Sequence, residues 1–334
     1  MPEPRRVLLV LATSTGGVGR HVASLATGLV DRGFDVTVAG PASTGRVFSF
    51  PCFVEVEVGA RPSPVRDARA LLTLRRLAKD ADLVHGHGLR AASLAVLCGR
   101  PVVTTWHNAV AGGLGRALER LVARRSDVVL AASADLAERA RVVGGKDVRL
   151  APVAAPPLVA TGRDPGLGTP LVLAVGRLHP QKGYDTLVAA LPWLRGAVVA
   201  VAGDGPLEAE LRAAAPEVHW LGRRDDVADL LAAADVLVLP SRWEARSLTV
   251  QEAMRAGTPV VATAVGGLPE LVQDGAVLVP PGDPQALGVA VRALLDDPAA
   301  ARALAARGRV VAACWPDDAD TVGEVGAVYA ELLA

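Results

Sequence analysis

Residues 171–194, LVLAVGRLHPQKGYDTLVAALPWL, give the first indication of the fold. The segment begins with the apolar run Leu171–Val175, continues through a loop bounded by Gly176 and Gly183, and leads into a predicted helix from about Tyr184. A continuous apolar run of this length is typical of a strand that is buried on both faces, as in a parallel sheet covered by helices. The segment therefore predicts a strand–loop–helix unit of an α/β fold.

Comparable apolar runs recur along the chain and fall into two series. The first series is Val7–Ala12, Asp35–Ala39, Leu83–His85, Val102–Trp106 and Val128–Ala131, and the second is Leu171–Val175, Val198–Ala202, Val236–Leu239 and Val260–Ala262. A chain of 334 residues also exceeds what one hydrophobic core usually serves. We therefore expect two Rossmann-like, doubly wound parallel sheets.

The domain boundaries follow from proline and glycine. Residues 151–170 contain five prolines and three glycines, a composition that excludes a helix or a central strand. The sequence predicts a first domain over residues 1–155, a linker over 156–170 and a second domain over 171–315. Because Trp315-Pro316 interrupts a long helical region, we expect residues 316–334 to form a last helix that joins the first domain.

Composition and charge narrow the class of protein. Hydrophobic residues make up 51% of the chain and charged residues 21%, which indicates a folded protein. The 35 basic and 35 acidic residues cancel, which argues against a nucleic-acid partner. Residues 1–160, however, carry 21 Lys and Arg against 13 Asp and Glu, a net charge of +8. This half is the one expected to face an anionic partner.

The cysteines and the start of the chain favour a cytoplasmic protein. The chain has three cysteines, an odd number, and Cys52, Cys98 and Cys314 lie far apart among apolar residues. We therefore interpret them as small buried side chains and exclude a disulfide framework or a zinc site. The run Val7–Ala12 is shorter than a signal-peptide core and far shorter than the about 20 residues that a membrane-spanning helix needs.

Two cations follow the first strand of the second domain. Arg177 and Lys182 stand five residues apart on a loop that ends at a predicted helix N-terminus. Two cationic side chains beside the partial positive charge of a helix end suit a diphosphate. An ordinary solvated loop is the alternative interpretation of such a pair.

Two carboxylates follow a later strand of the same domain. Glu244 lies in the loop after Val236–Leu239, and Glu252 lies about one turn inside the helix that follows. A carboxylate offers two acceptor oxygens and can bind a vicinal diol such as that of ribose. Capping of the helix start explains the pair equally well when it is taken alone.

The order of these motifs is more specific than any one of them. The Arg177–Lys182 loop is followed by Gly203-Asp204-Gly205-Pro206, by Glu244 to Glu252, by Gly257-Thr258-Pro259 and by Gly266-Gly267. Over about residues 171–284 this series resembles the carboxyl-terminal domain of glycosyltransferase family 4. The first half agrees in the segments Ser14–Val18, Asp82–Gly88 and Thr104–Asn108. The resemblance implies the GT-B fold, in which two such domains face each other across a cleft, and a retaining enzyme that uses a nucleotide sugar.

The resemblance also implies roles for residues at matching positions. Arg177 and Lys182 would neutralise the diphosphate leaving group, Glu252 would bind the ribose hydroxyls, and Glu244 would orient the donor hexose. His107 would lie beside the transferred sugar, although a histidine satisfied at a strand end is the structural alternative. The implied catalytic residues are His107, Arg177, Lys182 and Glu244. The implied donor-binding residues are Gly16, Gly17, Gly203, Arg223, Ala245, Arg246, Ser247, Leu248, Thr249 and Glu252.

One departure from the family concerns the donor sugar. The usual run after the first glutamate is Gly-Phe-Gly or Gly-Phe-Pro, and this chain has Ala245-Arg246-Ser247 instead. The backbone amides are kept, but Arg246 adds a cation or fills space near the sugar. We expect a UDP- or GDP-linked donor, because the residues that choose the base, near Arg223, do not distinguish the two.

No metal ion and no other cofactor are expected. The Asp80-Ala81-Asp82 segment matches the Asp-x-Asp pattern of metal-dependent transferases of another fold, but it precedes its strand and lies at the wrong end of the sheet for a ligand. His85 and His87 have no cysteine or acidic residue at ligand spacing, so we interpret them as structural or cleft-lining.

Three other functions share parts of this pattern. A Rossmann oxidoreductase is disfavoured because position 22 is valine and because the second strand ends in Gly40-Pro41 without an acidic residue. A non-catalytic sugar-nucleotide-binding protein and an epimerase of the same fold remain as alternatives.

The acceptor is expected to be a lipid or a lipid-linked precursor of the cell envelope. Basic residues cluster on two predicted helices, residues 66–79 and 114–125, where they alternate with Leu, Ala and Val. Such helices bind anionic membrane surfaces. We therefore expect peripheral contact with the inner face of the plasma membrane, with ordinary amphipathic helices covering a sheet as the alternative.

Overall fold

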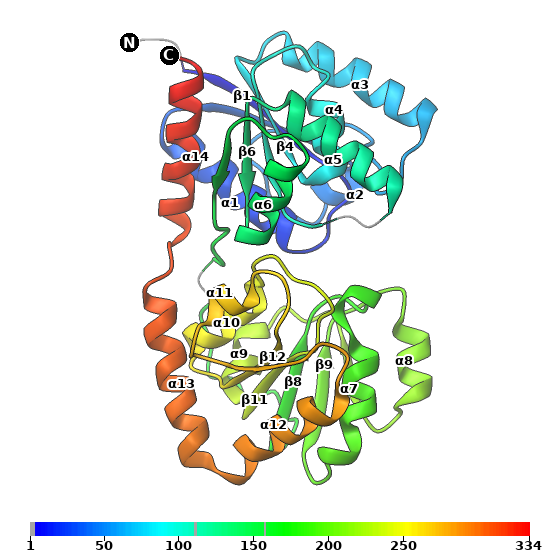
Figure 1. The fold of residues 1–334 in the computed structure, drawn as a ribbon, viewed down its shortest axis with the longest axis vertical. Coiled ribbons are helices and arrows are strands. Elements are labelled where there is room, and N and C mark those ends of the chain that lie inside the picture. The colour runs from blue at the N-terminus through cyan, green and yellow to red at the C-terminus, as the bar shows by residue number, and fades with distance from the viewer. Residues whose placement is uncertain (1–3, 110–111, 157) are drawn as a thin grey trace. The chain divides into compact units, whose positions relative to one another are not determined.

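A computed structural model describes residues 4–109, 112–156 and 158–334, so residues 1–3 of the predicted first domain and Pro157 of the predicted linker lie outside it. The described chain forms two compact units, residues 4–156 with 316–334 and residues 158–315. Each unit is a parallel β-sheet with helices on both faces (Figure 1). The predicted α/β class with two doubly wound sheets is confirmed.

The sheet of the first unit has the strand order β3-β2-β1-β4-β5-β6-β7. Its strands are β1 (Arg6–Leu11), β2 (Asp35–Gly40), β3 (Phe53–Glu55), β4 (Leu83–His87), β5 (Val102–Trp106), β6 (Val128–Ala131) and β7 (Val148–Leu150). Its helices are α1 (Gly17–Asp31), α2 (Ala42–Gly45), α3 (Pro64–Ala78), α4 (Gly88–Ala95), α5 (Gly113–Arg125), α6 (Ala134–Val142) and the C-terminal α14 (Asp318–Leu332). β3 and β7 were not predicted from the sequence, because they are only three residues long and lie at the sheet edges.

The sheet of the second unit has the order β10-β9-β8-β11-β12-β13. Its strands are β8 (Leu171–Val175), β9 (Val198–Ala202), β10 (His219–Gly222), β11 (Val236–Leu239), β12 (Val260–Thr263) and β13 (Val277–Val279). Its helices are α7 (Tyr184–Ala190), α8 (Glu208–Ala214), α9 (Val227–Ala233), α10 (Leu248–Ala256), α11 (Leu268–Val272), α12 (Pro284–Asp296) and α13 (Pro298–Ala313), with short 3-10 turns η1 (Pro180–Lys182) and η2 (Leu191–Trp193).

The central strands are buried on both faces, as their apolar runs predict. In β8, Leu171 and Leu173 pack with residues of α9, α10 and α13, whereas Val172 and Ala174 pack with residues of α7 and α12 on the opposite face. Alternate side chains of a strand point to opposite faces, so an uninterrupted apolar run supplies both cores. Each fully buried leucine contributes about 1.5–3 kcal/mol through removal of its side chain from water.

The last helix belongs to the first unit. Asp317 caps α14 by accepting from the backbone N–H of Asp320, whose carboxylate accepts in turn from the backbone N–H of Asp317. On α14, Val322 and Tyr329 are buried in the core of the first sheet. Trp315, by contrast, donates its indole N–H to the Leu271 carbonyl of the second unit.

None of the described residues between 151 and 170 lies in a helix or strand. Part of this segment is fastened to the second unit, because the Asp229 carboxylate of α9 accepts from the backbone N–H and the hydroxyl of Thr161, at 2.6 and 2.8 Å. The cysteine prediction is partly wrong: Cys98 is buried, but Cys52 and Cys314 are exposed.

The strand orders locate the ligand-binding edge of each sheet. The chain leaves β1 toward β2 on one side and later returns to place β4 on the other, and β8 has the same relation to β9 and β11. Ligands of doubly wound sheets bind at the carboxyl ends of the two strands that flank such a switch point. These ends are those of β1 and β4 in the first unit and those of β8 and β11 in the second.

Candidate active site

An ion pair lies at the switch point of the second sheet. Lys182, at the end of η1, donates from Nζ to Oε1 of Glu244 in the loop after β11, at 2.5 Å. The hydroxyl of Ser241 donates to the same oxygen at 2.7 Å. The side chains of Lys182 and Glu244 are 20% and 8% exposed, so the pair is partly shielded from water. The strand order thus brings together two residues that are 62 positions apart.

The loops around this pair pack backbone against backbone. Gly183 has a φ of +65°, and a Cβ there would lie 2.1 Å from the carbonyl oxygen of Pro240. Gly203 follows β9, and a Cβ there would lie 2.0 Å from the carbonyl oxygen of Gly176. Only glycine allows such approaches without moving the neighbouring loop. Gly203, which the sequence predicts in the donor site, therefore also supports the loop that carries Arg177.

The start of α10 continues the Glu244 loop. The Ser247 hydroxyl caps α10 by accepting from the backbone N–H of Val250, at 3.4 Å. Ala245 is buried, and Leu248 and Thr249 are half-buried. Glu252 is buried in the second turn of the helix. The backbone N–H groups of the first turn of a helix have no partner within the helix, which makes this loop suited to oxygen ligands.

Arg246 points its guanidinium toward Trp315. The centre of the guanidinium lies 5.8 Å from the centre of the indole ring, and Arg255 lies at the same distance. Nε and Nη2 of Arg246 are buried and have no hydrogen-bond partner among the described residues. Burial lowers the pKa of Arg246 to about 10, and the carboxylate of Glu270 opposes this shift. At neutral pH Arg246 therefore remains a buried cation.

The other predicted donor residues lie on loops at the same edge of their sheets. Arg177 follows β8 and Arg223 follows β10, and both side chains are exposed. In the first unit, Gly16 and Gly17 are exposed at the start of α1, where a Cβ on Gly16 would meet open space. His107 is buried directly after β5.

His107 belongs to a cluster of histidines at the switch point of the first sheet. His87 ends β4, and its Nδ1 lies 3.4 Å from Nε2 of His107. His21 of α1 packs edge-on against both rings. Burial lowers the pKa of His21 to about 4 and holds the pKa values of His87 and His107 well below 6.5. The three imidazoles are therefore uncharged at neutral pH.

His85 has a structural role. Its Nδ1 pairs with the hydroxyl of Tyr329 on α14 at 2.5 Å, and its Nε2 pairs with the hydroxyl of Thr105 at 2.7 Å. Both ring nitrogens are satisfied, and burial lowers the pKa of His85 to about 3. Its ring stacks on that of His87, with centres 4.0 Å apart.

Some residues of these sites were not singled out in the sequence. Ser241 contacts Glu244, and its position directly after β11 was the signal that could have identified it. His21 joins His87 and His107 through the fold alone, because it is 66 residues from the nearer of them. Asp82 binds the backbone N–H of Arg6 at the amino-terminal edge of the sheet, as predicted from its place before the strand.

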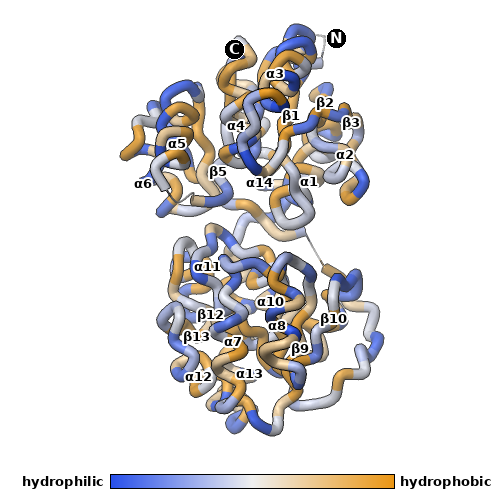
Figure 2. The backbone as a smooth tube through the Cα atoms, turned by 90° about the vertical axis from the view of Figure 1, so that its right-hand side faces the viewer, coloured by the Kyte–Doolittle hydropathy of each residue, from blue (hydrophilic) through white to orange (hydrophobic). Residues whose placement is uncertain are grey.

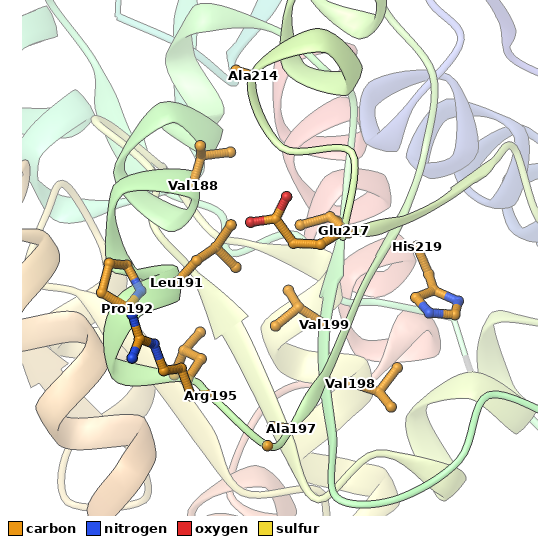
Figure 3. Close-up of a pocket in the computed structure, with 13 residues that line it drawn as sticks. Val188, Leu191, Pro192, Arg195, Ala197, Val198, Val199, Ala214, Glu217 and His219 are labelled. Atoms are coloured by element: carbon orange, nitrogen blue, oxygen red, sulfur yellow. The ribbon is translucent and has the colours of Figure 1, made fainter.

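A pocket of about 540 Å³ lies elsewhere in the second unit (Figure 3). Its lining includes Val188 of α7, Leu191 of η2, Val198 and Val199 at the amino-terminal end of β9, and Glu217. The Lys182–Glu244 pair lies at the opposite, carboxyl-terminal edge of the sheet. The pocket is therefore separate from the candidate donor site.

Comparison with known proteins identifies the family. Residues 15–153 match the family described as Glycosyltransferase Family 4, and residues 169–297 match the one described as Glycosyl transferases group 1. The chain is 33% identical to glycogen synthase of Mycobacterium tuberculosis, over 88% of this chain and 86% of that protein. It is 32% identical to phosphatidyl-myo-inositol mannosyltransferase of Mycobacterium leprae, over 84% of each.

A solved structure shows the same fold. The Anabaena protein HepE, in complex with UDP-glucose, is 20% identical and aligns with a TM-score of 0.85 over 98% of this chain and 99% of that one. At this identity the likeness concerns the GT-B fold alone. Together with the two matched stretches and the curated relatives, it establishes that the chain belongs to glycosyltransferase family 4 and is a glycosyltransferase with the GT-B fold.

Proposed function

We propose that this glycosyltransferase transfers a hexose, with retention of configuration, from a UDP- or GDP-linked sugar. The observation that carries the proposal is the Lys182–Glu244 pair at the switch point of the second sheet, with Arg177 on the same loop as Lys182. The UDP-glucose in the HepE structure supports a nucleotide sugar as the donor class.

The donor diphosphate is assigned to Arg177 and Lys182. An ammonium group has three N–H donors, so the one bond to Glu244 leaves two that can reach phosphate oxygens. Arg177 is exposed and adds a second cation. The leaving diphosphate gains negative charge as the glycosidic bond breaks, so both cations act most strongly in the transition state.

The ribose and the hexose are assigned to the α10 side of the site. Glu252 binds the ribose hydroxyls, and Glu244 orients the hexose while it holds Lys182 in place. The remaining donor contacts of the second unit are assigned to Gly203, Arg223 and the backbone of residues 245–249. In the first unit, we assign Gly16 and Gly17 to the distal phosphate and His107 to the transferred sugar.

Transfer proceeds without a divalent cation in this proposal. Arg177, Lys182 and the N–H groups at the start of α10 supply the positive field that a metal ion provides in other transferases. We expect sugar transfer to persist in EDTA. The measurement is product formation from the preferred donor before and after chelation, and complete loss of transfer that magnesium or manganese restores would contradict the assignment.

The acceptor is proposed to be a lipid or a lipid-linked envelope precursor at the inner face of the plasma membrane. On α3, Arg66, Arg69 and Arg76 are exposed together with Val65 and Leu72, which are 63% and 57% exposed. Hydrophilic and hydrophobic residues alternate along α3 and α5 (Figure 2). The lipid named as part of the substrate of the mycobacterial mannosyltransferase supports this class of acceptor.

No described helix has both the length and the hydropathy required to span a membrane. In the proposed surface contact, arginines attract anionic headgroups and exposed leucine and valine side chains enter the interface.

The experiment that tests the proposed activity is a screen of donor hydrolysis across UDP- and GDP-linked hexoses. The true donor is expected to be hydrolysed slowly without an acceptor, and the anomeric configuration of the transfer product shows whether configuration is retained. Binding without hydrolysis or transfer would favour the non-catalytic alternative. Release of an epimerised sugar, with no transfer to lipid extracts, would favour the epimerase.

A further inference from the structure

Three buried histidines at the switch point of the first sheet have the arrangement of a metal site. One ring nitrogen from each of His21, His87 and His107 lies within 4.8 Å of the other two. The residues come from α1 and from the carboxyl ends of β4 and β5, where doubly wound sheets bind ligands. We propose that these three side chains bind a divalent transition-metal ion of the class that imidazole prefers, represented by Zn²⁺.

The distances between the rings fit three ligands of one ion. A tetrahedral zinc ion with Zn–N bonds of about 2.0–2.1 Å holds its imidazole nitrogens about 3.4 Å apart and the ring centres about 5 Å apart. Nδ1 of His87 and Nε2 of His107 are 3.4 Å apart. The three ring centres form a nearly equilateral triangle with sides of 5.4, 5.7 and 5.7 Å. Binding of one ion requires the three ring nitrogens, which lie within 4.8 Å of one another, to approach to about 3.4 Å.

The hydrogen bonding within the cluster is incomplete without a ligand. The 3.4 Å contact between His87 and His107 exceeds the about 2.7–3.2 Å usual for a bond donated by N–H. Both ring nitrogens of His85 already have a close hydrogen-bond partner, so His85 is not counted among the metal ligands.

The surroundings also suit a metal ion. The uncharged imidazole is the form of histidine that binds a metal, and burial of the three rings disfavours the charged form. His85, fixed by Tyr329 and Thr105, stacks on His87 and limits its rotation. Three histidine ligands leave the fourth position of a tetrahedral ion open to water or to an anionic oxygen.

Metal binding predicts inhibition of sugar transfer. This consequence, unlike the site itself, rests on the proposed function, because it requires that His107 lie beside the transferred sugar. An ion bound to His107 occupies the place of the sugar at the carboxyl end of β5. The enzyme is then active without a metal and inhibited by Zn²⁺.

The test uses the untagged full chain after chelation and dialysis, with zinc binding measured by equilibrium dialysis and elemental analysis. We expect one ion per chain. His87→Asn and His107→Asn should each weaken zinc binding by at least about tenfold. Loss of a residue that only hydrogen-bonds to a metal ligand already costs about tenfold or more, and loss of a ligand itself should cost at least as much. The matched control is His219→Asn, because His219 is an exposed histidine on β10 of the other unit. Unchanged affinity in the His87 and His107 variants would overturn the proposal.

A second measurement does not depend on the folding of the variants. X-ray absorption of the zinc-loaded wild-type chain should show three imidazole nitrogens at about 2.0–2.1 Å, and Co²⁺ in place of Zn²⁺ should give the visible absorption of a tetrahedral ion. A spectrum with fewer than three imidazoles would overturn the site. Stoichiometric binding without inhibition would leave the site intact and contradict only the role of His107.

Discussion

Lys182 is the residue on which the proposed donor site depends most directly. Lys182→Ala removes a charge-assisted contact to a leaving group that gains charge in the transition state, so we expect kcat to fall about a hundredfold or more. Arg177→Ala should act in the same direction. The measurement is transfer with saturating donor, and Lys146→Ala, which removes an exposed lysine of the first unit, is the control. Near-normal turnover in both site variants would contradict the assignment.

Cys98 offers a second test at the scale of single residues. Burial raises the pKa of the Cys98 thiol to about 11, whereas Cys52 and Cys314 are exposed. Because the thiolate is the reactive form, Cys98 stays protonated and slow to react until the pH approaches its raised pKa. We expect iodoacetamide at pH 8 to modify Cys52 and Cys314 first, as measured by mass spectrometry of peptides. Labelling of Cys98 at an equal rate would show that the loop and helix α4 around it open readily.

At the scale of elements, one buried hydrogen bond fastens the last helix to the first sheet. Tyr329 of α14 is fully buried, and its hydroxyl contacts Nδ1 of His85 on β4. Tyr329→Phe leaves a buried ring nitrogen unpaired, which costs about 1–3 kcal/mol. We expect hydrogen exchange of the α14 amides to accelerate by about tenfold for each 1.4 kcal/mol lost.

The same experiment has a matched control in the second unit. Tyr184 is buried, and its hydroxyl donates to the carbonyl of Gly176 at 3.0 Å. Tyr184→Phe should therefore leave exchange in α14 unchanged. An equal acceleration of α14 in the two variants, or none in Tyr329→Phe, would mean that the His85 contact does not hold the helix.

At the scale of the whole molecule, the uneven charge predicts weak and salt-sensitive membrane binding. The +8 charge of residues 1–160 includes exposed arginines on α3 and α5, and each basic residue near an anionic leaflet contributes about 1 kcal/mol. We expect flotation with anionic vesicles at low salt and none with neutral vesicles.

Charge-reversal variants test whether this surface, and not another part of the molecule, binds the vesicles. Arg69→Glu with Arg120→Glu should reduce recovery with anionic vesicles, whereas Arg302→Glu on α13 should not. Equal recovery with neutral and anionic vesicles, or none at low salt, would favour a soluble acceptor.

Much of this protein is determined locally, and the sequence by itself was sufficient for those parts. The central strands of the two sheets follow from continuous apolar runs such as Leu171–Val175, whereas the edge strands β3, β7, β10 and β13 were not predicted. The absence of regular structure in the described part of residues 151–170 follows from their prolines and glycines. The family follows from the order of short motifs along the chain, which can be recognised without knowledge of any contact in the structure.

The tertiary structure alone decided which distant side chains meet. Lys182 touches Glu244 because β8 and β11 are neighbours, and His21 joins His87 and His107 because β1, β4 and β5 are adjacent. Strand order depends on how all helices pack on both faces at once, so no local window of sequence contains it. The direction of Arg246 toward Trp315 and the exposure of Cys52 and Cys314 are likewise set by packing between elements, which residue type and neighbouring residues do not specify.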